Sequence, residues 1–276
     1  MPLENPEEKP LENSSPSPRA PSDRILLRSE MAWGPADFAI FVGSAVLAFL
    51  LTDVVVLFGF LGLKAANVWR VSLSDVQQNP FFLLTFQVVF HLFLLGFIYL
   101  LVLSKHESGF WQSLAWRMPA QARRVQLFLA GLALAAVVRF TPTLLPERGS
   151  FPLERMFSTP ASAYAVAVFA ILIAPLMEEL IFRGILFAMF ESMIGIRFAV
   201  VATALLFAGL HIPEYWGAWH HVMMITVVGL VFSMARGLTG SLAASYILHL
   251  AYNFALIAIL FFETDQFRNI QALIQP

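Results

Sequence analysis

Two adjacent carboxylates, Glu178 and Glu179, lie in the middle of an apolar run that extends from Ala161 to Phe190. Arg183 follows one helical turn after Glu179. Ionisable side chains at membrane depth are costly, and membrane proteins that keep them commonly use at least one for chemistry. The run therefore predicts a site of proton transfer inside a bilayer.

Helical spacing gives the two carboxylates different roles. Glu179 and Arg183 stand at positions i and i+4, so they share one face of a helix and can form an ion pair. Glu178 is rotated by about 100° from Glu179, because one helical turn takes about 3.6 residues. We therefore expect Glu179 and Arg183 to support the site, and Glu178 to stay free to exchange a proton near neutral pH.

Three later polar side chains, His211, His249 and Asn253, also fall within apolar runs. At a rise of about 1.5 Å per residue, all three reach the same central depth of the bilayer as Glu178. This set suits acyl hydrolysis, in which Glu178 would take a proton from a water molecule that His211 holds or polarises. His249 and Asn253 would then donate hydrogen bonds to the oxyanion that forms on the carbonyl.

The same residues leave a metal-dependent alternative open. Glu178, His211 and His249 could hold Zn²⁺ and leave one coordination position for water. However, the sequence contains no H-E-x-x-H helix, and the three ligands would come from separate spans. We therefore expect no metal cofactor, with zinc as the alternative.

The composition indicates which elements must position these residues. Of 276 residues, 59% are hydrophobic and only 13% are charged, and the mean hydropathy is +0.75, which is typical of a polytopic membrane protein. The net charge of −1 gives no electrostatic basis for binding nucleic acid. The absence of cysteine excludes disulfides, thiolate metal sites and a cysteine-protease mechanism.

Apolar runs that can cross a bilayer need about 20 residues, and they must be helical because lipid offers no partner for unpaired backbone groups. We predict an all-α, polytopic transmembrane helical bundle of about seven spans, within a range of six to eight. The fourth run is longer than a bilayer requires, so we expect it to tilt or to break near Pro175. The seven runs lie at about 37–63, 81–103, 125–145, 161–190, 197–213, 219–236 and 239–262.

Four regions follow from this pattern. Residues 1–33 are rich in Pro, Ser, Glu and Asn, which predicts a disordered polar tail. Residues 34–160 form N-terminal transmembrane helices, residues 161–262 form a catalytic transmembrane core that holds the whole polar set, and residues 263–276 form a short tail.

Positive charges predict the orientation. Lys and Arg gather in the tail and in the second connection, and such segments face the cytoplasm. We expect a multi-pass protein of the plasma membrane with a cytoplasmic N-terminus and, with seven spans, a C-terminus outside. The residues concerned are Lys9, Arg19, Arg24, Arg28, Lys105, Arg117, Arg123 and Arg124.

Asp53 and His91 lie at a similar depth in the first two predicted spans. Their depth would allow them to form a structural pair.

Three motifs in order along the chain resemble the CAAX-protease and bacteriocin-processing (CPBP) superfamily of intramembrane proteases, which includes the Ras-converting CAAX endopeptidases. The family pattern is E-E-x-x-x-R, then F-x-x-x-H, then H-x-x-x-N. The resemblance covers residues 161–262, and the motifs read Glu178-Glu179-Leu180-Ile181-Phe182-Arg183, Phe207-Ala208-Gly209-Leu210-His211 and His249-Leu250-Ala251-Tyr252-Asn253.

The resemblance implies a glutamic-type intramembrane endopeptidase. Glu178 would be the general base, assisted by His211, and His249 and Asn253 would form the oxyanion pocket. The bond cleaved would lie near the membrane, in a prenylated CAAX-type peptide, near its C-terminus, or in another membrane-associated peptide or protein. The partners implied are this substrate and the lipid bilayer.

Two non-enzymatic classes remain as alternatives. One is a membrane scaffold or bacteriocin-immunity protein that binds a peptide without cleaving it. The other is a proton-coupled carrier, since acids and histidines inside spans suit that function as well. A carrier predicts paired broken helices and an inverted repeat, and the sequence shows neither.

Overall fold

The computed structural model describes residues 33–68, 72–76, 78–141 and 156–269, and within these residues all regular structure is helical. Six helical segments are long and apolar enough to cross a membrane. The predicted polytopic helical bundle is therefore confirmed, and the chain is an integral multi-pass membrane protein. The six segments are α2 (Pro35–Ala65), α4 (Pro80–Lys105), α6 (Gln121–Phe140), the segment Pro160–Ile194, α12 (Trp219–Thr239) and α13 (Leu242–Glu263).

The fifth predicted span is shorter than a full crossing. It forms α11 (Ile196–Leu210), whose 15 residues extend about 22 Å at 1.5 Å per residue. A hydrocarbon core is about 30 Å thick. The described chain thus has six full-length spans and one shorter apolar helix, at the lower end of the predicted range. Two short helices, α3 (Leu73–Val76) and α5 (Phe110–Ser113), lie in the connections.

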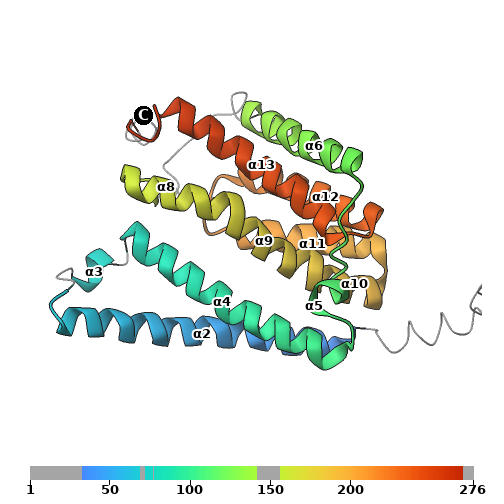
Figure 1. Ribbon diagram of the computed structural model, residues 1–276, viewed down its shortest axis with the longest axis horizontal. Helices are drawn as coiled ribbons and strands as arrows, with labels where there is room; N and C mark the ends of the chain where they lie inside the picture. Colours follow the sequence, from blue (N-terminus) through green and yellow to red (C-terminus); the bar gives the residue numbers. More distant parts are fainter. Residues whose placement is uncertain (1–32, 69–71, 77, 142–155, 270–276) are drawn as a thin grey trace, which may run out of the picture. The chain divides into compact units, whose positions relative to one another are not determined.

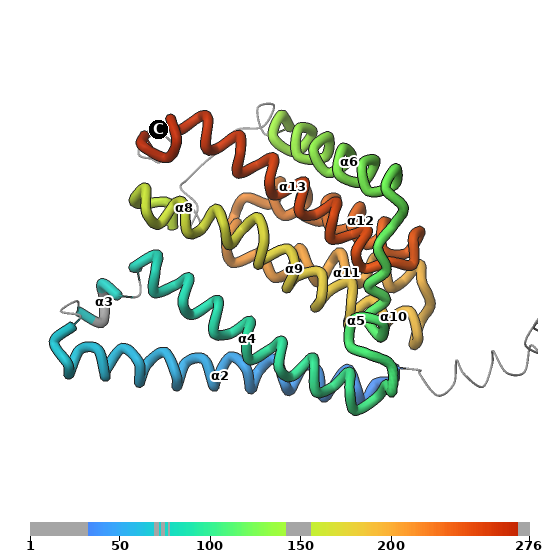
Figure 2. Tube along the Cα trace, in the orientation of Figure 1, coloured from blue at the N-terminus to red at the C-terminus, as the bar shows by residue number. Residues whose placement is uncertain are grey.

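The segment Pro160–Ile194 is the central element of the bundle. Within its most apolar window 44% of residues are buried, against 17% in α2 and α6, so more of this segment is packed against other helices. Figures 1 and 2 show it continuing as one rod beside α13. Its parts are α8 (Pro160–Val168), the π-helix η2 (Phe169–Ile173), α9 (Ala174–Glu179), the π-helix η3 (Leu180–Leu186) and α10 (Phe187–Ile194).

The expected break near Pro175 takes the form of a change in helix type. Proline has no N–H and its ring crowds the carbonyl of the preceding turn. Here the wider turns of η2 end directly before α9, whose second residue is Pro175, and the chain stays helical. A second π-helix, η3, begins directly after Glu179. The two carboxylates therefore sit in a short α-helical stretch between two π-helical segments, a feature that is frequent at functional sites.

Helix α13 is fixed at its start by contacts with the connection that follows α5. Gly240 ends α12 in the left-handed conformation, with φ +62°, and Ser241 accepts a hydrogen bond from the N–H of Ala244. The Ser241 hydroxyl donates to the Arg117 carbonyl, and the N–H of Leu242 donates to the Ala115 carbonyl at 3.0 Å. These bonds set the axial position of α13, and hence the depth of the polar side chains on it.

Residues 1–32 of the predicted tail lie outside the described residues. Trp33, the next residue, is buried. Its ring meets that of His106 at a centroid distance of 5.1 Å, and its carbonyl accepts a hydrogen bond of 2.9 Å from Ser192. The start of α2 is thereby held against the end of α10.

The pair of Asp53 and His91 that their depth would allow does not form. His91 stacks against Phe169 at a centroid distance of 5.9 Å. Among the described residues no hydrogen bond or ion pair joins Asp53 to His91. Equal depth was not sufficient, because Asp53 instead faces a groove between α2 and α4.

Candidate active site

Four side chains from three helices line one cavity of about 230 Å³. Glu178 comes from α9, His211 from the residue that ends α11, and His249 and Asn253 from α13. The structure therefore brings together all four residues that the sequence singled out for catalysis. The remaining wall is mostly apolar, with Phe169, Phe207, Val228 and Phe232 among its side chains.

Glu179 and Arg183 form an ion pair beneath this cavity. Their closest atoms, Oε1 and Nη1, are 3.2 Å apart, and neither side chain has any exposed surface. Glu178 differs sharply, since a quarter of its side-chain surface remains accessible. The difference in exposure separates a carboxylate enclosed by protein from one that water and substrate can reach.

Arg183 makes contacts with two other helices. Its Nη2 donates to the carbonyl of Gly229 at 2.9 Å, and its Nε donates to the hydroxyl of Ser233 at 3.3 Å, both on α12. The guanidinium also lies 4.7 Å from the ring centroid of Phe207 on α11, a cation–π contact. Because a buried charge is tolerated only when it is paired and hydrogen-bonded, these contacts explain how Arg183 can be enclosed.

His249 bridges the two glutamates. Its Nδ1 lies 3.0 Å from Oε1 of Glu179, and its Nε2 lies 3.5 Å from Oε2 of Glu178. The ring stacks on Phe232 at 4.2 Å, which fixes its plane. Since a carboxylate accepts hydrogen bonds, Nδ1 carries a proton and donates to Glu179. A bond between Nε2 and Glu178 then requires one further proton, held by either group, so this pair is suited to proton transfer.

His211 is oriented by the backbone of its own helix. Its Nδ1 lies 2.8 Å from the carbonyl oxygen of Phe207, one turn earlier. A carbonyl only accepts, so Nδ1 carries a proton, and in the neutral form of the ring Nε2 keeps its lone pair. In this tautomer Nε2 can accept a hydrogen bond from water.

Asn253 is positioned by the first π-helix. Its Nδ2 donates to the carbonyl of Ala170 in η2 at 2.8 Å. One amide N–H is used in this bond, and the second remains available as a donor. The π-helix thus holds the amide group at the wall of the cavity.

The structure also identifies residues that the sequence reasoning did not. Arg236 on α12 donates from Nε to the carbonyl of Arg183 at 3.1 Å, which supplies a partner for a backbone group of η3. Gln87 on α4 and Glu214 after α11 line the cavity. Their signals were present but weak: Arg236 is a cation at the end of an apolar run, and Glu214 follows His211 by three residues.

The ligand set for zinc does not assemble. Within the described part of the chain, no three side chains of His, Asp or Glu converge closely enough to hold a metal ion. Both nitrogens of His249 face carboxylates, with Nδ1 committed to Glu179. The described residues therefore contain no preassembled Glu–His–His cluster at the spacing that a metal ion needs.

The central segment of the chain matches a known family. Residues 160–255 match the family model described as Type II CAAX prenyl endopeptidase Rce1-like. This range begins at α8, ends two residues after Asn253 and contains all three motifs, so it confirms the predicted resemblance to the CPBP superfamily. Comparison with curated proteins and with solved structures gave no match.

Proposed function

Because residues 160–255 match the family model described as Type II CAAX prenyl endopeptidase Rce1-like, we propose that this chain is an intramembrane endopeptidase of the glutamic type. The observation that carries the proposal is the unequal environment of the two acids. Glu179 is enclosed and paired with Arg183, whereas Glu178 reaches the cavity and faces His249. A single reachable carboxylate beside a proton-sharing imidazole is what a general base requires.

The proposed reaction starts with the proton that Glu178 and His249 share. When it resides on Nε2 of His249, Glu178 is ionised and can take a proton from a water molecule that also donates to Nε2 of His211. The resulting hydroxide bonds to the carbonyl carbon of the substrate. His249 and the second N–H of Asn253 donate to the oxyanion that forms.

The second step breaks the peptide bond. As the C–N bond breaks, Glu178 returns the proton that it took from water to the leaving amine. The products are a carboxylic acid and an amine, and Glu178 is again ionised. Glu179 contributes without touching the substrate, because its negative charge stabilises the protonated form of His249.

The substrate class we propose is a membrane-associated peptide or protein, prenylated near its C-terminus or otherwise held at the bilayer. The proposed location is the plasma membrane, with the N-terminus in the cytoplasm. We further propose that the reaction needs no metal, because proton transfer by Glu178 is sufficient to activate water.

Replacing Glu178 with Gln tests the mechanism. The amide keeps the size of the side chain but cannot accept a proton, so the cleavage rate should fall by about 10²–10⁴-fold. The measurement is mass spectrometry of prenylated and plain peptides incubated with the purified protein in liposomes. Glu107→Gln, an exposed acid outside the cavity, is the matched control and should cleave as wild type does.

A chelator arm separates the two mechanisms. Wild-type cleavage should persist after complete chelation, and a loss that zinc restores would support the metal alternative instead. Equal cleavage by Glu178→Gln and wild type would remove Glu178 from the mechanism. Binding of peptide without cleavage by either protein would favour the scaffold class.

A further inference from the structure

The catalytic cavity shares lining residues with one neighbouring pocket, which in turn shares lining residues with another. Gln87, Met156 and Glu214 line both the cavity and a neighbouring pocket of about 370 Å³. Phe49, Leu83 and Phe86 line that pocket and a third one of about 420 Å³. The shared residues form an unbroken series from Glu178 to the space between α2 and α4.

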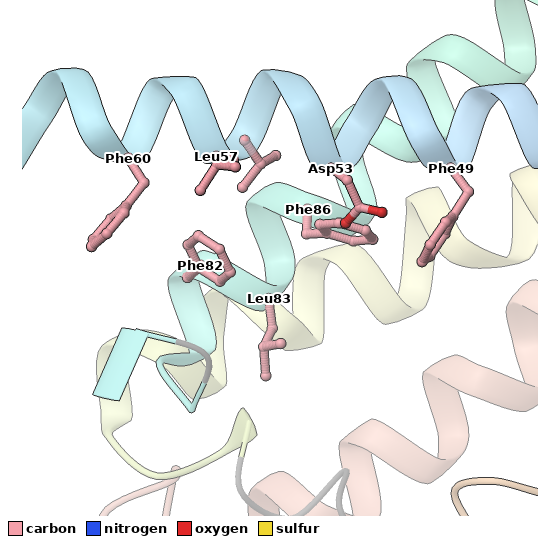
Figure 3. A pocket seen from close by; sticks show the side chains of 8 residues that line it. Phe49, Asp53, Leu57, Phe60, Phe82, Leu83 and Phe86 are labelled. Carbon is pink, nitrogen blue, oxygen red and sulfur yellow. The ribbon is translucent and has the colours of Figure 1, made fainter. Parts of the chain in front are cut away.

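We name the third pocket the α2–α4 groove. Figure 3 shows its side chains projecting from the two helices into one space. All but one are apolar, and six of them are phenylalanine or leucine. The lining residues are Phe49, Asp53, Val56, Leu57, Phe60, Phe82, Leu83 and Phe86.

Asp53 is the exception in this groove. It lies well inside the span formed by α2, and in Figure 3 its carboxylate stands between Phe49 and Phe86. In the described part of the chain it forms no hydrogen bond or ion pair. Acids inside spans usually face a cavity and have a partner, so an acid of this kind indicates a functional site.

Glu214 is a second acid on the same path. It lies where the catalytic cavity meets the middle pocket. Neither Lys nor Arg occurs among the residues that line the three pockets. The path therefore combines an apolar wall with negative charge and offers no positive charge of its own.

We propose that the α2–α4 groove and its junction at Glu214 bind an apolar segment of the substrate that carries a basic side chain. This inference rests on the proposed protease function and specifies its substrate. A lysine or arginine has an apolar stem that fits such walls and a cationic head that pairs with Asp53 or Glu214. Asp53 is exposed in this structure, and a hydrocarbon chain alone would cover its carboxylate without giving it a partner, which is costly.

The first test compares matched reporter peptides. Each peptide is membrane-associated and carries one lysine at successive positions on the amino-terminal side of the scissile bond, and its counterpart carries norleucine. We expect wild type to prefer the best lysine peptide by about tenfold in kcat/KM, which is a typical effect for a charge pair shielded from water. Asp53→Asn or Glu214→Gln should lower this ratio toward one, while Glu107→Gln leaves the ratio at its wild-type value.

A charge reversal makes the test sharper. Glu214→Lys should reverse the preference, so that a peptide with glutamate at the same position is cleaved faster than the lysine peptide. A change that merely disturbed folding would lower both rates together. A ratio near one in wild type at every lysine position overturns the inference.

The second test measures binding without cleavage. A photo-crosslinking p-benzoylphenylalanine replaces Leu57 in the groove or Val54 on a different face of α2, each in the Glu178→Gln protein. Val54 is half exposed and does not line the groove. We expect the lysine peptide to be captured from Leu57 and not from Val54. Equal capture from both positions would mean that the peptide only partitions into lipid, which contradicts a specific site.

The two tests distinguish this inference from the function on which it rests. If wild type cleaves no peptide but Leu57 still captures the lysine peptide, the protease function fails and the binding groove stands. If cleavage depends on Glu178 but shows no lysine preference, the protease function stands and the groove inference fails.

Discussion

Adjacent positions in one helix have opposite surroundings in this site, and the proposed mechanism gives them different functions. Glu179 points into protein and meets a guanidinium and an imidazole N–H, so its charge is fixed. Glu178 points into a cavity, where its contact with His249 at 3.5 Å leaves room for a proton to move. The proposed mechanism thus depends on keeping Glu179 charged, and that in turn depends on Arg183.

Replacing Arg183 with Gln should be strongly destabilising. The change removes the partner of a buried carboxylate together with the bonds to Gly229 and Ser233. Loss of one partner from a buried ion pair costs about 3–5 kcal/mol. Thermal unfolding in detergent measures the effect. Arg197→Gln is the control, because Arg197 is exposed at the start of α11 and its loss should change stability by less than about 0.5 kcal/mol. Similar melting temperatures for the two variants would contradict the structural role of Arg183.

The surroundings of His106 predict that the folded protein loses stability in acid. It lies just outside the span of α4 and is buried, and neither ring nitrogen has a hydrogen-bond partner. Burial lowers the pKa of His106 below its ordinary value of 6.5, and the charge of Lys105 lowers it further, while Asp37 opposes the shift. Below the ordinary pKa of 6.5, the unfolded chain therefore binds a proton at His106 more readily than the folded protein does. The contribution of His106 to stability is complete above pH 6.5 and decreases as the pH falls below it.

A phenylalanine variant isolates this effect. His106→Phe keeps a ring against Trp33 but cannot take a proton. Between about pH 7.5 and about pH 5.5, the melting temperature of wild type should therefore fall more than that of the variant. Parallel losses in the two proteins would show that other groups cause the acid sensitivity.

At the level of helices, close backbone approach positions the polar residues. Helix α6 packs on α13 at Gly131, where an added Cβ would collide with the Leu248 carbonyl oxygen and lie 2.7 Å from Cβ of Ala251. These contacts involve residues of α13 within two positions of His249. The absence of a side chain at Gly131 thus lets α6 support the helix that carries two site residues.

Gly131→Ala should therefore loosen α6 from α13. Overpacking of this kind costs about 1–3 kcal/mol, and a shift of α13 should also reduce cleavage. Gly96→Ala in α4 is the control, since no atom lies within 4 Å of its added Cβ. Alanine favours a helix over glycine by up to about 1 kcal/mol, so the control should be neutral or slightly more stable. Thermal unfolding and peptide cleavage together measure both outcomes.

The sequence predicted the helical elements better than their internal geometry. Apolar runs identify spans because their length must match the thickness of a bilayer. The i to i+4 spacing identified the ion pair of Glu179 and Arg183. The π-helices could not be predicted, because they depend on partners from other helices. Asn253 donates a hydrogen bond to one freed backbone carbonyl, that of Ala170, and Arg236 donates to another, that of Arg183.

The same limit applies to contacts between helices. Depth along a span predicted that Glu178, His211, His249 and Asn253 could meet, and they line one cavity. Depth also allowed the pair of Asp53 and His91, which does not form. The rise per residue gives the depth of a side chain in the bilayer, but not the direction in which it points around the helix axis. That direction is decided by how the helices pack against one another.

At the scale of the whole molecule, the first and last described residues, Trp33 and Asn269, lie at opposite ends of the helical bundle. Trp33 before α2 lies beside Ser192 at the end of α10, and Ser241 before α13 is bonded to Arg117. Helix α13 then runs away from this end, and its last residue, Glu263, pairs with Arg139 at the end of α6, 2.8 Å apart.

The number of full-length spans does not by itself decide the topology. Six spans would place both termini on one side, but α11 and α12 form an antiparallel pair. Near the end of α12, a Cβ on Gly237 would lie 3.5 Å from Val200 and 3.6 Å from Ile196, at the start of α11. Whatever fraction of the bilayer α11 crosses, α12 returns the chain to the side from which α11 began.

We therefore predict a cytoplasmic N-terminus and a C-terminus on the outer side. The end of the bundle that holds Trp33 also holds Lys105 and Arg117, as expected for cytoplasmic connections. The chain has no cysteine, so single introduced thiols are its only sites of maleimide labelling. A membrane-impermeant maleimide should label Asn269→Cys in intact cells, and Ser14→Cys or Met118→Cys only after permeabilisation. Labelling of Asn269→Cys and Ser14→Cys under the same condition would show that both termini share one side, and that α11 and α12 do not return the chain as their packing indicates.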